Sequence, residues 1–264
     1  MSKHKGKLEG KRITTANGLT MYSRSSIEPV PPEAPTIVLV HGLSVSSGYM
    51  MPTAVRLAPY YHVYLPDLPG FGRSPKPHQI LNVTELADAL ASWMRAMNLP
   101  PAMLLGNSMG CQTIVNFALR YPECIERAIL VSPTMDTKVL TIHQEFGRLL
   151  RDTPCEPLHF LPVLLREYAL AGITRTIRSL QYAFEDPMEQ NLPHVHIPTL
   201  VVRGSRDPIV PQDWAEKVNV LLPNSKLVVV EGAGHAVNFN SPDRLVQLVQ
   251  SFLQDTNNPM PLAT

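Results

Sequence analysis

The chain has 264 residues, of which 44% are hydrophobic and 17% charged, and its formal net charge is +1. This composition is typical of a globular protein with a sizeable core, and it excludes a disordered chain. The near-zero charge argues against nucleic acid or an anionic membrane as a partner, and no apolar run is long enough to span a bilayer. The basic start of the chain leads into no apolar segment, so we expect no secretory signal.

The first predicted element is an antiparallel hairpin over residues 12–24. Asn17 and Gly18 stand between two short alternating segments in this stretch. An Asn-Gly pair in that setting is a strong local signal for a tight turn between two strands.

Six short apolar runs follow, rich in leucine and β-branched residues, and each ends at a Gly, Pro, Asp or Asn. Continuous apolar runs of this kind are typical of parallel strands that are covered on both faces. They span residues 36–42, 62–68, 102–107, 127–133, 199–207 and 226–235. Segments with helical spacing alternate with them, at residues 82–99, 111–122 and 241–254. The alternation predicts an α/β fold with a doubly wound, mostly parallel sheet.

One region interrupts this alternation. Between Pro133 and Pro198 no buried strand is predicted, and three amphipathic segments read as helices instead, at residues 141–152, 161–172 and 173–186. We expect them to form a helical cap, or lid, over a ligand site. The alternative is that these helices only cover one face of the sheet. The expected organisation is a first core part over 1–133, a cap over 134–197 and a second core part over 198–264.

The stretch from Gly106 to Gly110 matches the G-x-S-x-G nucleophile elbow, with Ser108 at its centre. A predicted strand precedes it and a predicted helix follows it, as this motif requires. The serine would occupy a strained strand-to-helix turn, so its flanking positions must be small. The helix N-terminus and the amide of Met109 would favour an oxyanion that develops beside the serine oxygen.

Among nine histidines, His235 is the candidate general base. It follows a predicted strand that ends in a glycine turn, and it precedes the last helix. A loop there places its side chain above the carboxyl edge of the sheet, the same rim as Ser108, where sites of open α/β sheets collect.

The acid that orients the histidine should follow another strand. Asp207 ends the strand predicted over 199–207, and its carboxylate would accept a hydrogen bond from one ring nitrogen of His235. Asp207 also precedes Pro208, and Asp-Pro is a common turn. Asp136, just beyond another strand end, is the rival acid.

The loop after the first parallel strand is the candidate for the second oxyanion donor. His41 and Gly42 turn the chain there, and the amide of Leu43 would point at the oxyanion. His41 is expected to have a packing role and not to act as the base. Asp67 and Arg73, in a nearby glycine-containing loop, are interpreted as residues that tie that loop together.

Three cysteines, Cys111, Cys124 and Cys155, include no C-x-x-C pair. Their odd number and spacing argue against a disulfide framework or a zinc site and favour a reducing, cytoplasmic compartment. We expect no metal and no organic cofactor, and the sequence leaves a homo-oligomer open.

The sequence resembles the α/β-hydrolase fold family. The stretches "HGLSVSSG", "DLPGFGRS", "GNSMG", "RGSRDPIVP" and "GAGHAVNFNSPDRL" stand in the family's order. The resemblance implies a triad of Ser108, Asp207 and His235, with an oxyanion hole from the amides of Leu43 and Met109. A serine at position 108 argues against the members that use an aspartate nucleophile, such as haloalkane dehalogenases and epoxide hydrolases.

The function expected from these features is that of a carboxylesterase acting on a small-molecule ester with a small to medium acyl group. The elbow is also similar to that of the meta-cleavage-product hydrolases, which break carbon–carbon bonds. In that group a tryptophan commonly follows the catalytic histidine, where this chain has Ala236, and a cap arginine that binds the substrate's acid has no aligned counterpart. Carbon–carbon cleavage is therefore the second interpretation, and a cofactor-free perhydrolase is a further one. A ligand receptor that retains the triad represents a different class, because fold does not fix function.

Overall fold

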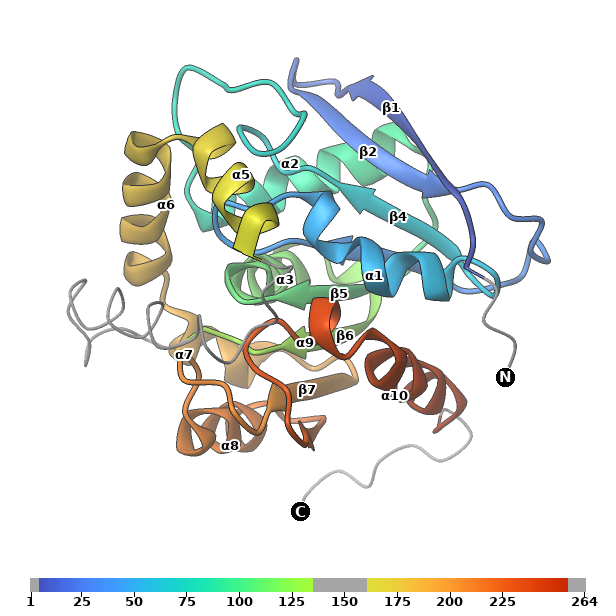
Figure 1. The fold of residues 1–264 in the computed structure, drawn as a ribbon, viewed down its shortest axis with the longest axis vertical. Helices are drawn as coiled ribbons and strands as arrows, with labels where there is room; N and C mark the ends of the chain where they lie inside the picture. Colours follow the sequence, from blue (N-terminus) through green and yellow to red (C-terminus); the bar gives the residue numbers. More distant parts are fainter. Residues whose placement is uncertain (1–4, 135–160, 256–264) are drawn as a thin grey trace.

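An eight-stranded sheet forms the centre of the computed structural model, which describes residues 5–134 and 161–255. Its strand order is β1-β2-β4-β3-β5-β6-β7-β8 (Figure 1). The strands are β1 (Leu8–Thr14), β2 (Thr20–Ser26), β3 (Thr36–Val40), β4 (His62–Pro66), β5 (Ala102–Asn107), β6 (Ile125–Val131), β7 (Thr199–Gly204) and β8 (Ser225–Val230). β1 and β2 pair antiparallel, as do β2 and β4, and every other neighbouring pair is parallel. The predicted mostly parallel sheet with an N-terminal hairpin is confirmed.

Helices cover both faces of the sheet. They are α1 (Ser47–Leu57), α2 (Val83–Ala96), α3 (Met109–Arg120), the single turn η1 (Pro122–Cys124), α5 (Leu161–Ala171), α6 (Ile173–Glu185), α7 (Met188–Asn191), the single turn η4 (Leu192–His194), α8 (Gln212–Leu221), α9 (Val237–Asn240) and α10 (Pro242–Gln254). Buried residues of α1, α9 and α10 belong to one hydrophobic core, and those of α2, α3 and α8 belong to the other.

The position of β3 in the sheet explains why its residues are apolar throughout and do not alternate with polar ones. Ile37 and Leu39 belong to the core beneath α1 and α10, whereas Val38 and Val40 belong to the core beneath α2 and α3. Side chains of a strand alternate between the two faces, so a strand covered on both sides needs apolar residues throughout. β8 differs because it is an edge strand, and most of its residues are partly or fully exposed.

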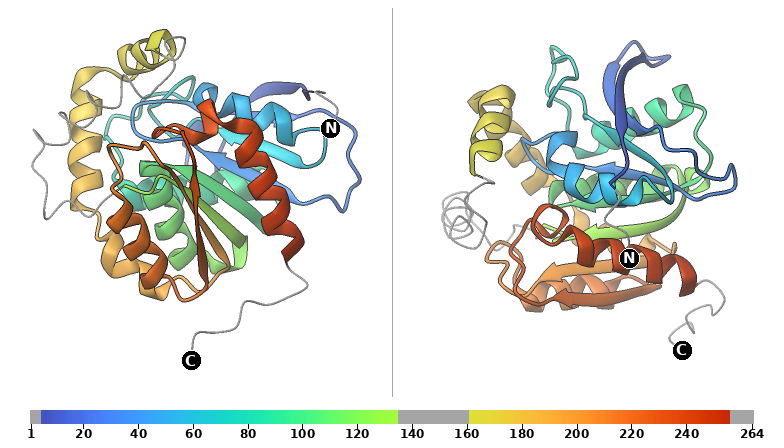
Figure 2. Two further views of the ribbon diagram at one scale, coloured as in Figure 1. Left: turned by 60° about the horizontal axis from the view of Figure 1, so that its bottom comes forward. Right: turned by 45° about the vertical axis from the view of Figure 1, so that its right-hand side comes forward.

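Between β6 and β7 the described residues form helices and no strand. The helices predicted over 161–172 and 173–186 are observed as α5 and α6. Both lie beyond one end of the sheet in the two views of Figure 2. The helix predicted over 141–152 and the rival acid Asp136 lie outside the described residues.

The structure adds two local features that the sequence pattern did not specify. The hairpin closes through a three-residue loop, because Gly18 donates to Thr15 and Thr15 donates to Leu19, with Gly18 at a φ of 81°. The tight turn predicted at Asn17 and Gly18 is therefore confirmed, and the glycine takes the left-handed conformation. Helices α1 and α8 had no predicted counterpart; α1 contains Pro52, which obscures the helical pattern.

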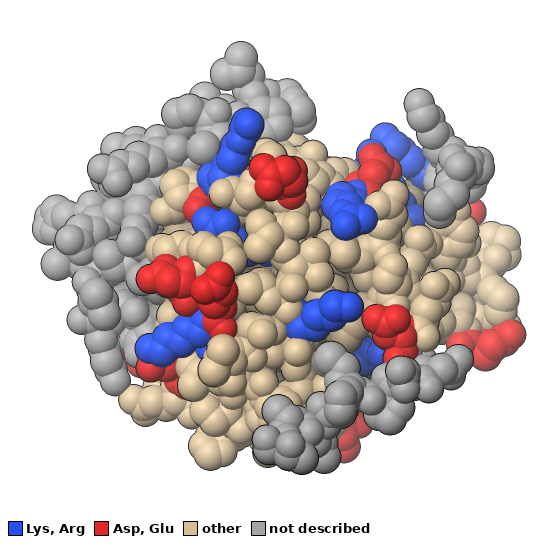
Figure 3. Space-filling model, turned by 90° about the horizontal axis from the view of Figure 1, so that it is seen from below, with Lys and Arg blue, Asp and Glu red and all other residues tan. Residues whose placement is uncertain are grey.

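No helix in the described part of the chain has the length and apolar character needed to cross a membrane. On the face shown in Figure 3, basic and acidic side chains are interspersed and separated by uncharged surface. Neither sign of charge gathers into a patch on that face.

Candidate active site

The strand order reverses at β3, and this reversal opens the sheet edge where the site forms. β4 lies on one side of β3 and β5 on the other, with Val40 at the end of β3 paired to Gly106 near the end of β5. The chain after β3 leads to α1 on one face, and the chain after β5 leads to α3 on the opposite face. A crevice at the carboxyl edge of the strands is expected where neighbouring connections diverge in this way.

Ser108 occupies the turn between β5 and α3 in a strained conformation. Its φ is 55° and its ψ is −125°, a region that residues other than glycine rarely adopt. In the stretch 102–118, all of which is described, Ser108 is the one residue that is not buried. The strained turn therefore holds this side chain at the surface of an otherwise closed core.

The glycines around Ser108 permit close approach of three chain segments. A Cβ at Gly110 would lie 2.5 Å from the carbonyl oxygen of Val40, and a Cβ at Gly42 would lie 3.2 Å from Cβ of Ser108. The loop that begins at Gly42 and carries Leu43 thus lies directly against the serine. Met109 is the first residue of α3, so its amide has no acceptor within the helix.

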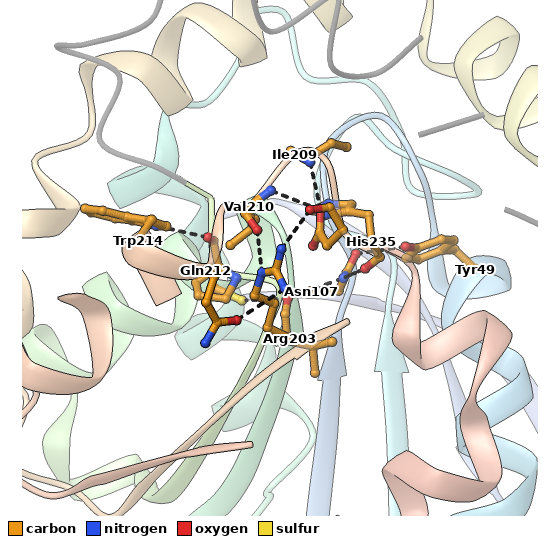
Figure 4. Close-up of polar contacts among 12 residues, drawn as sticks. Tyr49, Asn107, Arg203, Ile209, Val210, Gln212, Trp214 and His235 are labelled. Carbon is orange, nitrogen blue, oxygen red and sulfur yellow. Dashed lines mark hydrogen bonds and ion pairs between the residues drawn. The ribbon is translucent and has the colours of Figure 1, made fainter. Parts of the chain in front are cut away.

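His235 and Asp207 are in contact, as the sequence predicted. Nδ1 of His235 lies 2.9 Å from Oδ2 of Asp207. The other oxygen, Oδ1, accepts hydrogen bonds from the amides of Ile209 at 2.8 Å and Val210 at 3.0 Å (Figure 4). The turn-forming role and the histidine-orienting geometry of Asp207 therefore coexist, one on each carboxylate oxygen.

The surroundings of Asp207 favour its charged form. The residue is 3% exposed, and this burial alone would raise its pKa. The nearby charge of His235, together with hydrogen bonds from His235 and the Val210 amide, outweighs the burial and holds the pKa of Asp207 below its ordinary value. Asp207 is therefore an anion beside the imidazole at neutral pH.

Asn107, the residue before Ser108, connects the serine turn to His235. Its Nδ2 donates to the carbonyl oxygens of His235 and Val131, both at 3.3 Å, and its Oδ1 accepts from the hydroxyl of Tyr49 at 2.9 Å. Figure 4 shows Asn107 between Tyr49 and His235. Sequence reasoning assigned no role to this asparagine, because its three partners come from distant parts of the chain.

Arg203 is a second residue that sequence reasoning missed. The residue is 7% exposed, and its guanidinium donates to the carbonyl oxygens of Val210 at 2.6 Å and Asp207 at 3.0 Å, and to Gln212 at 3.3 Å. Arg203 lies on β7 and thus fixes the loop that carries the acid. The sequence feature that could have indicated this role is a charged residue within an apolar strand, in the stretch "TLVVRG".

His41 has both ring nitrogens occupied. Nδ1 donates to the carbonyl oxygen of Gly42 at 2.8 Å, and Nε2 accepts from the amide of Leu68 at 2.9 Å. This arrangement requires the neutral ring, and burial lowers the pKa of His41 against the opposing effects of Asp67, the Gly42 carbonyl and Glu167. His41 braces two loops and is not free to act as a base.

Asp67 also holds the neighbouring loops together, as expected. Its carboxylate accepts from the amide of Ser47 at the start of α1 and from the amide of Arg73, both at 2.7 Å.

Among the residues that the structure describes, no group of three or more His, Cys, Asp or Glu side chains is placed to hold a metal ion.

Known proteins share this fold and sequence pattern. The sequence pattern described as "Alpha/beta hydrolase family" matches residues 37–248. The carboxylesterase YbfK of Bacillus subtilis (strain 168) is 27% identical over 249 residues, which cover 84% of this chain and 81% of that protein.

Solved structures show the same architecture. A bacterial membrane phospholipase A superposes with a TM-score of 0.81 at 24% identity, covering 95% of this chain and 87% of that one. The 2-hydroxy-6-oxo-6-phenylhexa-2,4-dienoate hydrolase of Rhodococcus sp. strain RHA1 superposes with a TM-score of 0.77 at 21% identity, covering 94% and 99%. At these identities the superpositions establish a common fold and leave the reaction to the site itself.

Proposed function

The chain belongs to the alpha/beta hydrolase family, and we propose that it is a serine carboxylesterase acting on small to medium acyl esters. One observation carries the proposal. A strained, partly exposed Ser108 follows β5, and its neighbour Asn107 bonds to the residue whose imidazole contacts Asp207. Nucleophile, base and acid thus come from three loops at one edge of the sheet.

The proposed reaction begins with proton transfer from Oγ of Ser108 to Nε2 of His235. The serine oxygen attacks the ester carbonyl carbon, and the amides of Leu43 and Met109 stabilise the resulting oxyanion. His235 then protonates the departing alcohol, and the acyl group remains on Ser108. Water attacks this acyl-enzyme with His235 again as the base, which releases the carboxylic acid.

Asp207 would select the useful tautomer of His235. Its Oδ2 accepts a hydrogen bond from Nδ1–H, so the ring proton stays on Nδ1 and Nε2 is left unprotonated to act as the base. The carboxylate also stabilises the imidazolium that forms during each proton transfer. The depressed pKa of Asp207 keeps it ionised for both tasks.

We further propose that residues 134–197 form a cap over the substrate site, between the core parts 1–133 and 198–264. Two contacts support this. Ser44, next to Leu43, bonds to Thr176 of α6, and Gln112 on α3 bonds to Ala183 of the same helix at 2.8 Å. α6 thus touches both the candidate oxyanion loop and the helix that follows the nucleophile.

Ester cleavage is tested by hydrolysis of p-nitrophenyl acetate, butyrate and octanoate by the protein and by its Ser108→Ala variant. We expect sustained turnover that falls by about 10³-fold or more in the variant, whose thermal unfolding stays unchanged. Undiminished turnover by Ser108→Ala would overturn the assignment. A protein inactive on all three esters but active on a vinylogous diketone would instead be a carbon–carbon hydrolase.

A further inference from the structure

We propose that Thr176 of the cap helix α6 is a positioning residue for the oxyanion hole, which it holds in place through Ser44. The inference rests on the proposed function, because it assigns Thr176 a part in the same acyl transfer. It makes α6 a component of the catalytic geometry and not only a wall of the substrate site.

The contact itself is direct. Oγ of Ser44 donates a hydrogen bond to Oγ1 of Thr176 at 2.8 Å. Ser44 is 1% exposed, so its hydroxyl is shielded from water in the folded protein. A buried hydroxyl left without a partner is costly, and the pair therefore ties the loop after β3 to α6.

The backbone conformation of Ser44 is strained, so it needs a contact that holds it in place. Its φ is 57°, in the left-handed region that favours glycine. Ser44 directly follows Leu43, the proposed oxyanion donor, and two residues before it Gly42 packs against Ser108. Relaxation of the strained residue would rotate the Leu43–Ser44 peptide and shift the backbone of Leu43, which moves its amide relative to the serine oxygen.

α6 is a firm support for this purpose because it is anchored on both sides of Thr176. Arg175 is 8% exposed, donates to the carbonyl oxygen of Pro77 at 3.3 Å and packs closely on the backbone of Gly70. Just past the end of the helix, Asp186 accepts from Asn116 at 2.8 Å and from Gln112 at 3.2 Å. The helix cannot follow the loop if the loop moves.

The oxyanion hole acts mainly in the transition state, and this sets the signature of a positioning role. A displaced amide weakens stabilisation of the tetrahedral oxyanion while substrate binding stays nearly unchanged. A side chain that merely lined the substrate site would alter KM instead. One that merely stabilised the fold would lower the melting temperature without changing kcat of the folded protein.

The test is Thr176→Val, which removes the hydroxyl and keeps the volume, with Thr176→Ser as the variant that restores it. Thr174→Val is the matched control, because Thr174 is exposed on the same helix. We expect kcat for p-nitrophenyl butyrate to fall about tenfold in Thr176→Val, with KM within twofold, and to return in Thr176→Ser. The control variant Thr174→Val should have the same kcat and KM as the parent protein.

An alkyl trifluoromethyl ketone supplies the second readout, because its adduct with a serine nucleophile places an oxyanion in the hole. Its affinity should fall in Thr176→Val by the same factor as kcat/KM. In a double-mutant cycle, the double variant Ser44→Ala with Thr176→Val should show no larger loss of kcat than either single variant. Unchanged kcat in Thr176→Val, or a loss confined to KM, would overturn the inference.

The failure of this inference is separable from the failure of the proposed function. If Ser108→Ala retains turnover, the serine mechanism is wrong. If Ser108→Ala is inactive while Thr176→Val matches the parent protein in kcat and ketone affinity, only the role of Thr176 is wrong.

Discussion

The carboxylate of Asp207 is divided between His235 and its own loop: Oδ2 lies 2.9 Å from Nδ1 of the imidazole, and Oδ1 binds two backbone amides. The amides fix the carboxylate, and the carboxylate in turn fixes the ring. The orientation of His235 therefore depends on the fold of the 207–210 turn as much as on the charge of Asp207.

Because the two carboxylate oxygens of Asp207 have different partners, the effects of Asp207→Asn on stability and on catalysis should differ. The amide oxygen of asparagine can keep the bonds to Ile209 and Val210, so the melting temperature should change by only a few degrees. Its NH₂ group would donate to Nδ1 of His235 and impose the wrong tautomer, so kcat should fall about 10²- to 10⁴-fold. Ester kinetics and thermal unfolding of the purified variant measure both effects.

Asp136→Asn is the control for this prediction, since Asp136 was the rival acid. We expect it to retain at least half of the activity. A near-normal rate in Asp207→Asn together with an inactive Asp136→Asn would transfer the acid role to Asp136.

Arg203→Met should weaken both stability and catalysis. The change removes the bonds to the carbonyl oxygens of Val210 and Asp207 and leaves these buried acceptors without a donor. We expect the free energy of unfolding to fall by about 2–4 kcal/mol and kcat to fall with it as the acid loop loosens. Arg206→Met, at an exposed position of the same loop, should change neither. Equal urea midpoints for the two variants would contradict the role of Arg203.

Gly204→Ala should displace the histidine loop. A Cβ at this position would lie closer than 3.0 Å to the carbonyl oxygens of Ala233 and Gly234, which are backbone atoms and cannot rotate away. Because His235 follows directly, we expect kcat to fall at least tenfold, with about 1–3 kcal/mol lost in stability. At Gly48 the nearest atom would be 3.4 Å from a new Cβ, so Gly48→Ala should be tolerated. Full activity in Gly204→Ala would show that the loop adapts.

The neutral, buried His41 predicts a pH dependence of stability. Burial lowers its pKa in the folded protein, so the unfolded chain binds a proton at mildly acidic pH that the folded chain refuses. The free energy of unfolding should therefore fall as the pH decreases from 7 to 5, as urea titrations at both values would measure. In NMR spectra the His41 ring signals should stay constant over this range. His41 ring signals that shift between pH 7 and pH 5 would contradict the neutral assignment.

Local patterns in the sequence were sufficient to predict most of the sheet. Strands covered on both faces appear as unbroken apolar runs, and β3, β5, β6 and β7 were predicted from them. The helix predicted from Cys111 begins two residues earlier, at Met109, because the turn at Ser108 leads straight into it. The helix α1 was missed because Gly48 and Pro52 interrupt its pattern although its tertiary contacts stabilise it.

The candidate site was predictable only in part. Asp207 and His235 each end a strand-to-loop segment, and parallel strands bring such ends to one edge, so their contact could be anticipated. The bonds of Asn107 and Arg203 depend on the register of strands far apart in the sequence and on loop conformations that no local pattern encodes. The contact of Ser44 with Thr176 joins residues 132 positions apart and is equally invisible in the sequence.

Covalent labelling tests directly whether Ser108 is the nucleophile. The protein is treated with an alkyl fluorophosphonate, digested and analysed by mass spectrometry, with Ser108→Ala as the control. We predict one phosphonyl adduct per chain, on the peptide that contains Ser108, with loss of esterase activity in proportion to labelling and no adduct in the control. An adduct on another residue that abolishes activity, or complete labelling of Ser108 with turnover intact, would show that Ser108 is not the nucleophile.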